Sequence, residues 1–184
     1  MTGVSKISNK EMKDVAKIIS NSKLKELKIL YIFGDSKCGM TKTKDFLPDL
    51  MKITTQQIYL DNLVLGEEDL ATIFKNATNV KELCLVNCQI SNIGKDFEIS
   101  SKQKYKMQTL DLFYTCVQDS DKYLNEKKLT ALLEEIEKTK LPDTLRTLHV
   151  CSADFDKDDL SDILNDHETG MKLKLDSKQP DTLD

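Results

Sequence analysis

The fold is decided by residues 80–90, which read VKELCLVNCQI. Apolar residues stand at Val80, Leu83 and Leu85, and the alternation around Leu83 has the period of two that a short strand requires. The same spacing returns along the chain in blocks whose middle positions are residues 27, 58, 83, 110, 148 and 173. Such a recurrence predicts an array of similar units rather than one irregular core.

The first of these blocks is read as Leu24, Leu27 and Ile29. This reading places Leu30 and Tyr31 among the residues that point away from the core. The blocks centred on residues 58 and 173 match the spacing less well, because each begins with a residue that is not strongly apolar, Thr55 and Gly170.

Segments with helical spacing lie between the strand blocks. Residues 14–21 (DVAKIISN) align with residues 69–76 (DLATIFKN) and with residues 159–166 (DLSDILND). Residues 129–136 keep the same apolar face in a longer helix, and residues 46–51 supply a shorter one. Apolar residues at positions i, i+3 and i+4 form one buried stripe. We therefore expect side chains such as Val15 and Ile18 to be buried.

The combined pattern resembles leucine-rich repeats of the long, ribonuclease-inhibitor-like kind. The family pattern L-x-x-L-x-L-x-x-N/C-x-L is met best in residues 80–90, with Cys88 at the Asn/Cys position. Ile32 and Leu63 depart from the pattern at that position. The resemblance implies an α/β solenoid, a horseshoe arc of about five to six repeats, with a parallel sheet on its concave side and helices on its convex side.

The expected organisation follows the repeats. Residues 1–23 are predicted to form an N-terminal capping helix, residues 24–176 the leucine-rich repeats, and residues 177–184 a flexible tail. One strand–helix unit cannot bury its apolar face alone, so stacking joins these faces into a shared core. Lysines at Lys172 and Lys174 would discourage further pairing at the last strand.

Composition argues against several classes of protein. The chain has 27 basic and 31 acidic side chains, and Arg146 is its only arginine, so we expect no nucleic-acid partner. No apolar run reaches the length of a membrane span, and charged residues interrupt the first 20 positions, so we expect no membrane association. Five cysteines without a C-x-x-C pair favour a cytoplasmic, reducing location.

The positions between the apolar ones would build one continuous outward surface. Exposed aromatic residues flanked by Asp and Asn are typical of an interaction hot spot. We therefore expect a scaffold-like, non-enzymatic module, a monomer on its own, that binds a protein partner on its concave face without a cofactor or metal. The residues assigned to this partner site are Tyr59, Asp61, Val86, Asp111, Phe113, Tyr114 and His149.

Two other functions remain open: a structural subunit of a large intracellular assembly, and a regulator of a small GTPase, as some members of this repeat type are. Chemistry has weaker support. Cys84, Asp111 and His149 share one row and could bind zinc or pair a nucleophile with a base, but no second Cys–His pair closes a metal shell.

The acidic run in residues 154–159 lacks the Gly and Glu that an EF-hand calcium loop requires, and it is read as an acidic helix start. The sequence also has no phosphate-binding glycine loop and no nucleophile elbow.

Overall fold

The computed structural model describes residues 9–22, 24–34, 47–90, 99, 103–112, 116–117, 126–151 and 172–176 of the chain. Its helices are α1 (Asn9–Asn21), α2 (Leu47–Ile53), α3 (Glu67–Asn76) and α4 (Glu126–Glu137). The longer strands are β1 (Leu27–Phe33), β2 (Thr54–Asp61), β4 (Glu82–Val86), β6 (Thr109–Leu112), β8 (Thr147–Cys151) and β9 (Lys172–Asp176). Three two-residue strands are β3 (Val64–Leu65), β5 (Gln89–Ile90) and β7 (Cys116–Val117).

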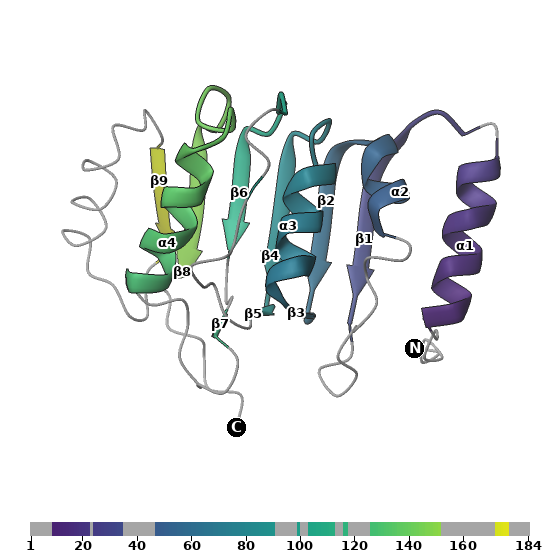
Figure 1. The fold of residues 1–184 in the computed structure, drawn as a ribbon, viewed down its shortest axis with the longest axis horizontal. Helices are drawn as coiled ribbons and strands as arrows, with labels where there is room; N and C mark the ends of the chain where they lie inside the picture. The colour runs from purple at the N-terminus through teal and green to yellow at the C-terminus, as the bar shows by residue number, and fades with distance from the viewer. Residues whose placement is uncertain are drawn as a thin grey trace.

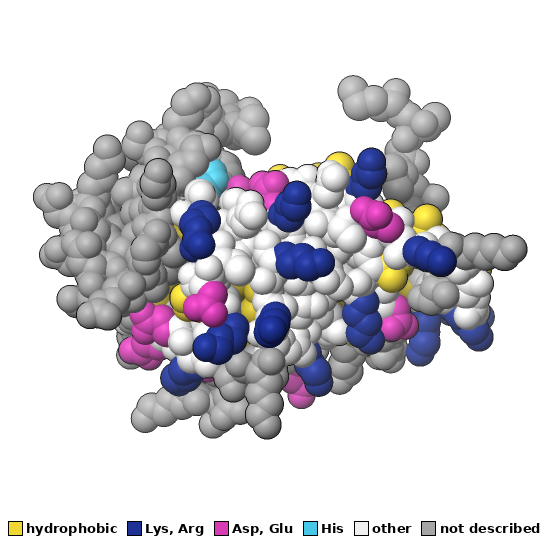
Figure 2. Space-filling model, turned by 90° about the horizontal axis from the view of Figure 1, so that it is seen from above, with side chains coloured by type: hydrophobic (Ala, Val, Ile, Leu, Met, Phe, Trp, Pro, Cys, Tyr) yellow, Lys and Arg dark blue, Asp and Glu magenta, His cyan; other side chains and the backbone are white. Residues whose placement is uncertain are grey.

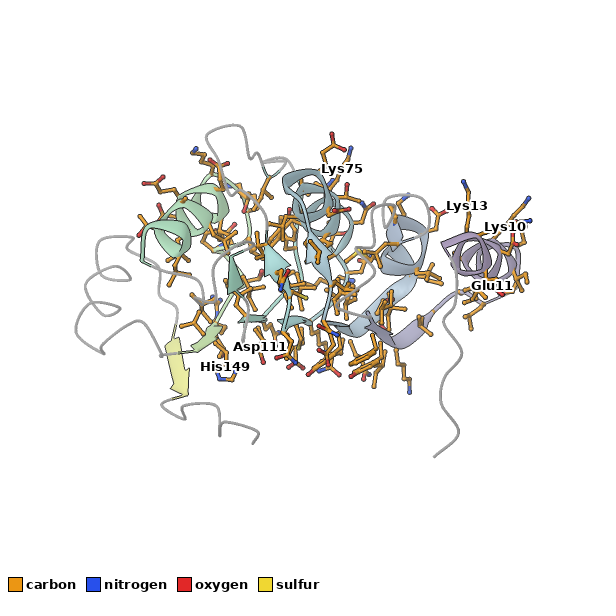
Figure 3. The ribbon with its side chains drawn as sticks, turned by 90° about the horizontal axis from the view of Figure 1, so that it is seen from below. Lys10, Glu11, Lys13, Lys75, Asp111 and His149 are labelled. Atoms are coloured by element: carbon orange, nitrogen blue, oxygen red, sulfur yellow. The ribbon has the colours of Figure 1, made fainter. Side chains whose placement is uncertain are left out.

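The longer strands form one parallel sheet in the order β1-β2-β4-β6-β8-β9, which is also their order in the chain. Helices α2, α3 and α4 all lie on one face of this sheet (Figures 1 and 3). A parallel pair needs a crossover connection, and here each helix lies in such a connection. The predicted α/β architecture with a parallel sheet is therefore confirmed.

The strand register aligns the apolar positions of successive units. Leu83 pairs with Leu110, and Leu110 pairs with Leu148, so the three predicted core residues lie side by side. A second row runs parallel to the first through Leu85 and its counterparts. Where the side chains are described, both rows are buried. Together the two rows contain Leu30, Ile58, Leu83, Leu110, Leu148, Ile32, Leu60, Leu85, Leu112 and Val150.

Helix α3 illustrates how a helix begins and packs against these rows of apolar side chains. The Asp69 carboxylate accepts a hydrogen bond from the Gly66 N–H at 3.0 Å, which stabilises the start of the helix. Leu70, Ile73 and Phe74 follow at the i, i+3 and i+4 spacing, and all three are buried. The predicted helical segments at residues 69–76, 129–136 and 46–51 are therefore confirmed, apart from residue 46, which lies outside the described residues. The predicted helix at residues 159–166 and the predicted tail at residues 177–184 lie outside the described residues.

The predicted alignment of the first strand with its neighbour is wrong by three residues, because Leu30, and not Leu27, is the equivalent of Ile58. Leu30 pairs with Ile58 and is buried, although it was expected to point outward. Ile29 was expected in the core, but it is 55 % exposed. Residues 27–33 read LKILYIF, so both faces of the strand are apolar and periodicity alone cannot choose between them. Pairing with β2 makes the choice.

The predicted burial of the α1 stripe is also wrong in part. Ala16 is buried and Ile19 is half-buried, but Val15 is exposed and Ile18 is 69 % exposed. Helix α1 packs against α2 and lies beyond β1, at the end of the molecule (Figure 1). Only part of its apolar surface therefore meets another helix.

The short strands β3, β5 and β7 form a second parallel sheet that the sequence reading did not separate from the main one. The chain reaches it by turning directly after β2 and β4, where Asn62 and Asn87 adopt left-handed φ angles of 57° and 51°. Asparagine tolerates this conformation better than most residues. The Asn62 Nδ2 donates to the Gly34 carbonyl oxygen at 2.9 Å, so the turn also joins the first two units.

Cys88 occupies the position predicted for a core residue, and the prediction is confirmed. Its side chain is completely buried. Its Sγ donates to the Leu60 carbonyl oxygen at 3.4 Å, which links one unit to the unit before it. A buried thiol of this kind acts as a small apolar side chain with a weak donor.

Candidate functional site

The candidate site is the outward face, defined here as the face of the six-stranded sheet opposite the helices. Side chains of this face project away from the helix layer, as Asp111 and His149 do in Figure 3. The strand register brings five of them into one row: Tyr31, Tyr59, Cys84, Asp111 and His149. The predicted row of Cys84, Asp111 and His149 is therefore confirmed as a geometry.

Two tyrosines form the aromatic part of the row. The rings of Tyr31 and Tyr59 are stacked, with centroids 4.8 Å apart and an interplanar angle of 11°. The Tyr31 hydroxyl donates to Asp61 Oδ2 at 3.3 Å, and Asn87 Nδ2 donates to Asp61 Oδ1 at 3.1 Å. The Asp61 carboxylate is thus held by a donor from each neighbouring unit, and it stays largely buried between them.

The pKa values of both phenols in this row are raised. Burial first, and then the charge of Asp61, raise the pKa of Tyr59 to about 12. The pKa of Tyr31 is also raised, chiefly by desolvation and then by Asp61. A protonated Tyr31 can donate to Asp61, so the hydrogen bond and the pKa direction agree.

Cys84 is a poor candidate for chemistry despite its place in the row. Its Sγ accepts from Gln57 Nε2 at 3.7 Å and donates to Glu82 Oε1 at 3.6 Å. Burial first, and then the charges of Glu82 and Asp111, raise the pKa of the Cys84 thiol to about 12, although the hydrogen bond from Gln57 opposes the rise. The thiolate is the form that attacks carbonyls and binds metals, and at neutral pH very little of it is present.

His149 and Asp111 form a close contact beside Cys84. The distance from His149 Nδ1 to Asp111 Oδ2 is 3.1 Å, and both side chains are mostly buried. The contact is an ion pair only when the imidazole is protonated. In the described part of the chain, no three His, Cys, Asp or Glu side chains are grouped so as to hold a metal ion.

Five of the seven predicted partner-site residues fall within the described residues, and all five point to the outward face: Tyr59, Asp61, Val86, Asp111 and His149. Val86 was expected to be exposed, but it is buried, because it belongs to an inner strand of the sheet. Phe113 and Tyr114 lie outside the described residues. The sequence reading left Tyr31 out of the site, although the alternation Ile29-Tyr31-Phe33 could have indicated it.

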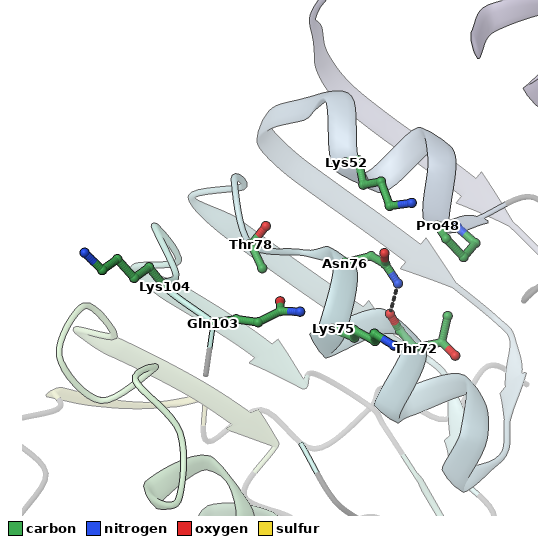
Figure 4. Close-up of a pocket in the computed structure, with 8 residues that line it drawn as sticks. All are labelled: Pro48, Lys52, Thr72, Lys75, Asn76, Thr78, Gln103 and Lys104. Atoms are coloured by element: carbon green, nitrogen blue, oxygen red, sulfur yellow. Dashed lines mark hydrogen bonds between the residues drawn. The ribbon is translucent and has the colours of Figure 1, made fainter. Parts of the chain in front are cut away.

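A hollow of about 700 Å³ lies on the helix side, between α2, α3 and residues 103–104 (Figure 4). Three lysines, Lys52, Lys75 and Lys104, are among its lining residues. Lys52 and Lys75 are in the last turns of α2 and α3, where a cation is favoured by the helix dipole. Lys52 also lies 3.5 Å from the Asp49 carboxylate. The helix ends explain Lys52 and Lys75, and Lys104 alone does not indicate a ligand, so the hollow carries no ligand assignment.

No protein-family model and no curated protein matches this chain. Among the helices that the structure describes, none is long and apolar enough to cross a lipid bilayer.

Proposed function

We propose that this chain is a leucine-rich-repeat protein of the ribonuclease-inhibitor-like kind, a solenoid that binds a protein partner on its outward face. Parallel strands in chain order, helices on one face and a buried Cys88 at the Asn/Cys position support the repeat assignment. In this proposal the protein acts in the cytoplasm, as a rigid recognition surface without catalysis.

The single observation that carries the proposal is the fixed aromatic–acidic surface around Tyr31, Tyr59 and Asp61. The two rings are stacked, and the carboxylate is held by donors from Tyr31 and Asn87. Ordering side chains on binding costs about 0.5–1.5 kcal/mol for each flexible side chain, and a surface that is already ordered avoids much of that cost. Tyrosine is also among the residues that dominate binding at interfaces.

The charge of the surface indicates the chemistry of the partner. Asp61, Glu82 and Asp111 lie on three adjacent strands, and the sequences of β2, β4 and β6 contain no lysine or arginine. Complementary charge accelerates association and excludes partners of the same sign. We therefore expect the contacting segment of the partner to be basic and the association to weaken as salt increases.

The test begins with affinity purification from the native cell, followed by binding measurements with the purified partner. We expect the double substitution Tyr31→Ala and Tyr59→Ala to weaken binding by about tenfold or more. The matched control is Lys75→Ala on the helix side, which should leave binding unchanged. Thermal unfolding of each variant shows whether the fold is retained.

Two results would contradict the proposal. The first is unchanged partner affinity in the folded tyrosine double variant. The second is loss of binding in the Lys75→Ala control, which would move the site to the helix side. Recovery of the chain only within a large particle would favour the structural-subunit function, and an effect on nucleotide hydrolysis would favour the GTPase regulator.

A further inference from the structure

Exposed hydrophobic side chains gather at one end of the molecule. Among the described residues, all of the large hydrophobic side chains that are exposed fall within residues 15–33 of the chain. Figure 2 shows apolar side chains interspersed with charged ones at this end. The exposed residues are Val15, Ile18, Leu24, Ile29, Tyr31 and Phe33. Single exposed apolar residues are ordinary, but several gathered at one end of a molecule favour an interaction surface.

The backbone of β1 also indicates an interaction surface at this end of the molecule. β1 is an end strand of the sheet and pairs with β2. The Gly34 N–H donates to the Asp61 carbonyl oxygen of β2 at 2.8 Å. Because successive residues of a strand direct their polar groups to opposite sides, the N–H and C=O of Ile29, Tyr31 and Phe33 point to the outer edge. Such an edge is a template for another strand.

Helix α1 overhangs this edge. It lies beyond β1, in the same layer as α2 (Figures 1 and 3). Lys10 and Lys13 point away from the sheet in Figure 3, whereas Glu11 lies on the side that faces the plane of the sheet. Val15 and Ile18 follow Glu11 at spacings of four and seven residues, so they lie on the same side of the helix. Their exposed side chains therefore face the space beside β1.

The space beside β1 and below α1 suits one strand that brings no helix of its own. A second copy of this chain, paired through its own β1, would bring helices into the layer that α1 already occupies. Lys25, just before β1, and Lys28, within it, outnumber the intervening Glu26 and favour acidic residues at the adjacent end of the strand. We propose that the outer edge of β1 binds an extended peptide segment of another protein, apolar at its centre and acidic at its end.

In this arrangement the peptide extends the sheet by one strand. Its backbone forms hydrogen bonds with the N–H and C=O groups of Ile29, Tyr31 and Phe33 at the outer edge of β1. These hydrogen bonds supply affinity that does not depend on the sequence of the peptide. Alternate side chains of the peptide contact Val15 and Ile18 on the helix side, and the others lie beside the exposed side chains of β1. Burial of these apolar groups on both faces favours Val or Ile at the centre of the peptide. This site uses the backbone edge of β1, whereas the outward-face site proposed above uses the side chains of Tyr31, Tyr59 and Asp61; Tyr31 belongs to both.

The test uses the full chain and a synthetic peptide, EEVTVTVEE, as the probe. We expect the bound peptide to slow amide hydrogen exchange at residues 29, 31 and 33 by about tenfold or more, with little change at residues 30 and 32. Alternate N-methylation of the peptide should reduce its affinity by about tenfold, because it removes backbone donors. Ile18→Asp should reduce affinity to a similar extent, and Lys75→Asp is the matched control.

The proposal is overturned if the peptide fails to bind, if it binds without protecting those three amides, or if folded Ile18→Asp binds it normally. It is also overturned if sedimentation shows a dimer whose β1 amides are protected without peptide, because the occupant is then a second copy. Tyr59→Ala should change peptide affinity by no more than about twofold. Failure of the edge site and failure of the outward-face site are therefore distinguishable.

Discussion

Strands β1 and β4 follow the same pattern but differ in how much of their surface is covered. The register makes Phe33, Asp61 and Val86 equivalent positions on β1, β2 and β4. Phe33 is 66 % exposed, whereas Val86 is 7 % exposed. β4 lies between β2 and β6, whereas β2 is the one partner of β1 among the described strands. Burial on the outward face is therefore set by the number of neighbouring strands rather than by how apolar the residue is.

The same difference extends to the core. In a stack of similar units, stability is the sum of each unit's own contribution and the contacts with its neighbours. A central unit has two such sets of contacts, and an end unit has one. We therefore expect substitutions in β4 to cost more than equivalent substitutions in β1.

The largest expected effect is the cost of shortening a core leucine. Leu83 is completely buried between neighbouring strands, and Leu30 is its counterpart at the end of the sheet. Leu→Ala substitutions in cores cost about 2–5 kcal/mol. We expect Leu83→Ala to lie near the upper limit and Leu30→Ala near the lower one, as measured by urea unfolding. Equal costs would show that the comparison between end and centre is wrong.

A smaller effect is expected at the contact between the end unit and the next unit of the stack. Asn62→Ala removes the hydrogen bond to the Gly34 carbonyl and replaces asparagine, which tolerates the left-handed region, by alanine, which tolerates it less well. These changes together should lower the free energy of unfolding by about 2 kcal/mol. Asn62→Gly removes the hydrogen bond but tolerates the φ angle, so its cost should be about half. If both variants unfold at the same urea concentration, the left-handed φ carries no cost.

The smallest expected effect concerns Cys84, whose contribution to the free energy of unfolding changes with pH only in alkali. The Cys84 thiol loses its proton near pH 9 when unfolded but near pH 12 when folded. Below pH 9 the stabilisation from the buried, protonated thiol is complete, and it is lost as the pH rises toward 12. Cys84→Ala should therefore make the fall in stability between pH 9 and 12 shallower.

The control for this titration is Ile29→Ala at the end of the sheet. Ile29 is exposed and does not titrate, so its substitution should leave the alkaline slope nearly unchanged. Urea unfolding at several pH values measures both slopes. An alkaline slope that is the same with and without Cys84 would contradict the role assigned to its burial.

Much of the fold could be predicted from the spacing of apolar residues. The core-facing residues around Leu110 and Leu148 were predicted correctly because polar residues alternate with apolar ones there, which leaves a single apolar face. Around Leu83 the match of residues 80–90 to the repeat pattern indicated the core-facing side. The core-facing residues of the first strand could not be predicted in this way, because LKILYIF is apolar on both faces. The candidate site was only partly predicted: Tyr59 and Asp61 were assigned to it, but their contacts with Tyr31 depend on the corrected alignment of the first strand.

By itself, the sequence determined which residues repeat and which of them share one side of a strand or helix. Periodicity has this power because successive side chains leave the backbone in fixed directions. Only the tertiary structure decided which side is covered: it buried Leu30, exposed Ile18 and stacked Tyr31 on Tyr59. Burial depends on what lies alongside a segment, and neighbours along the chain do not specify neighbours in space.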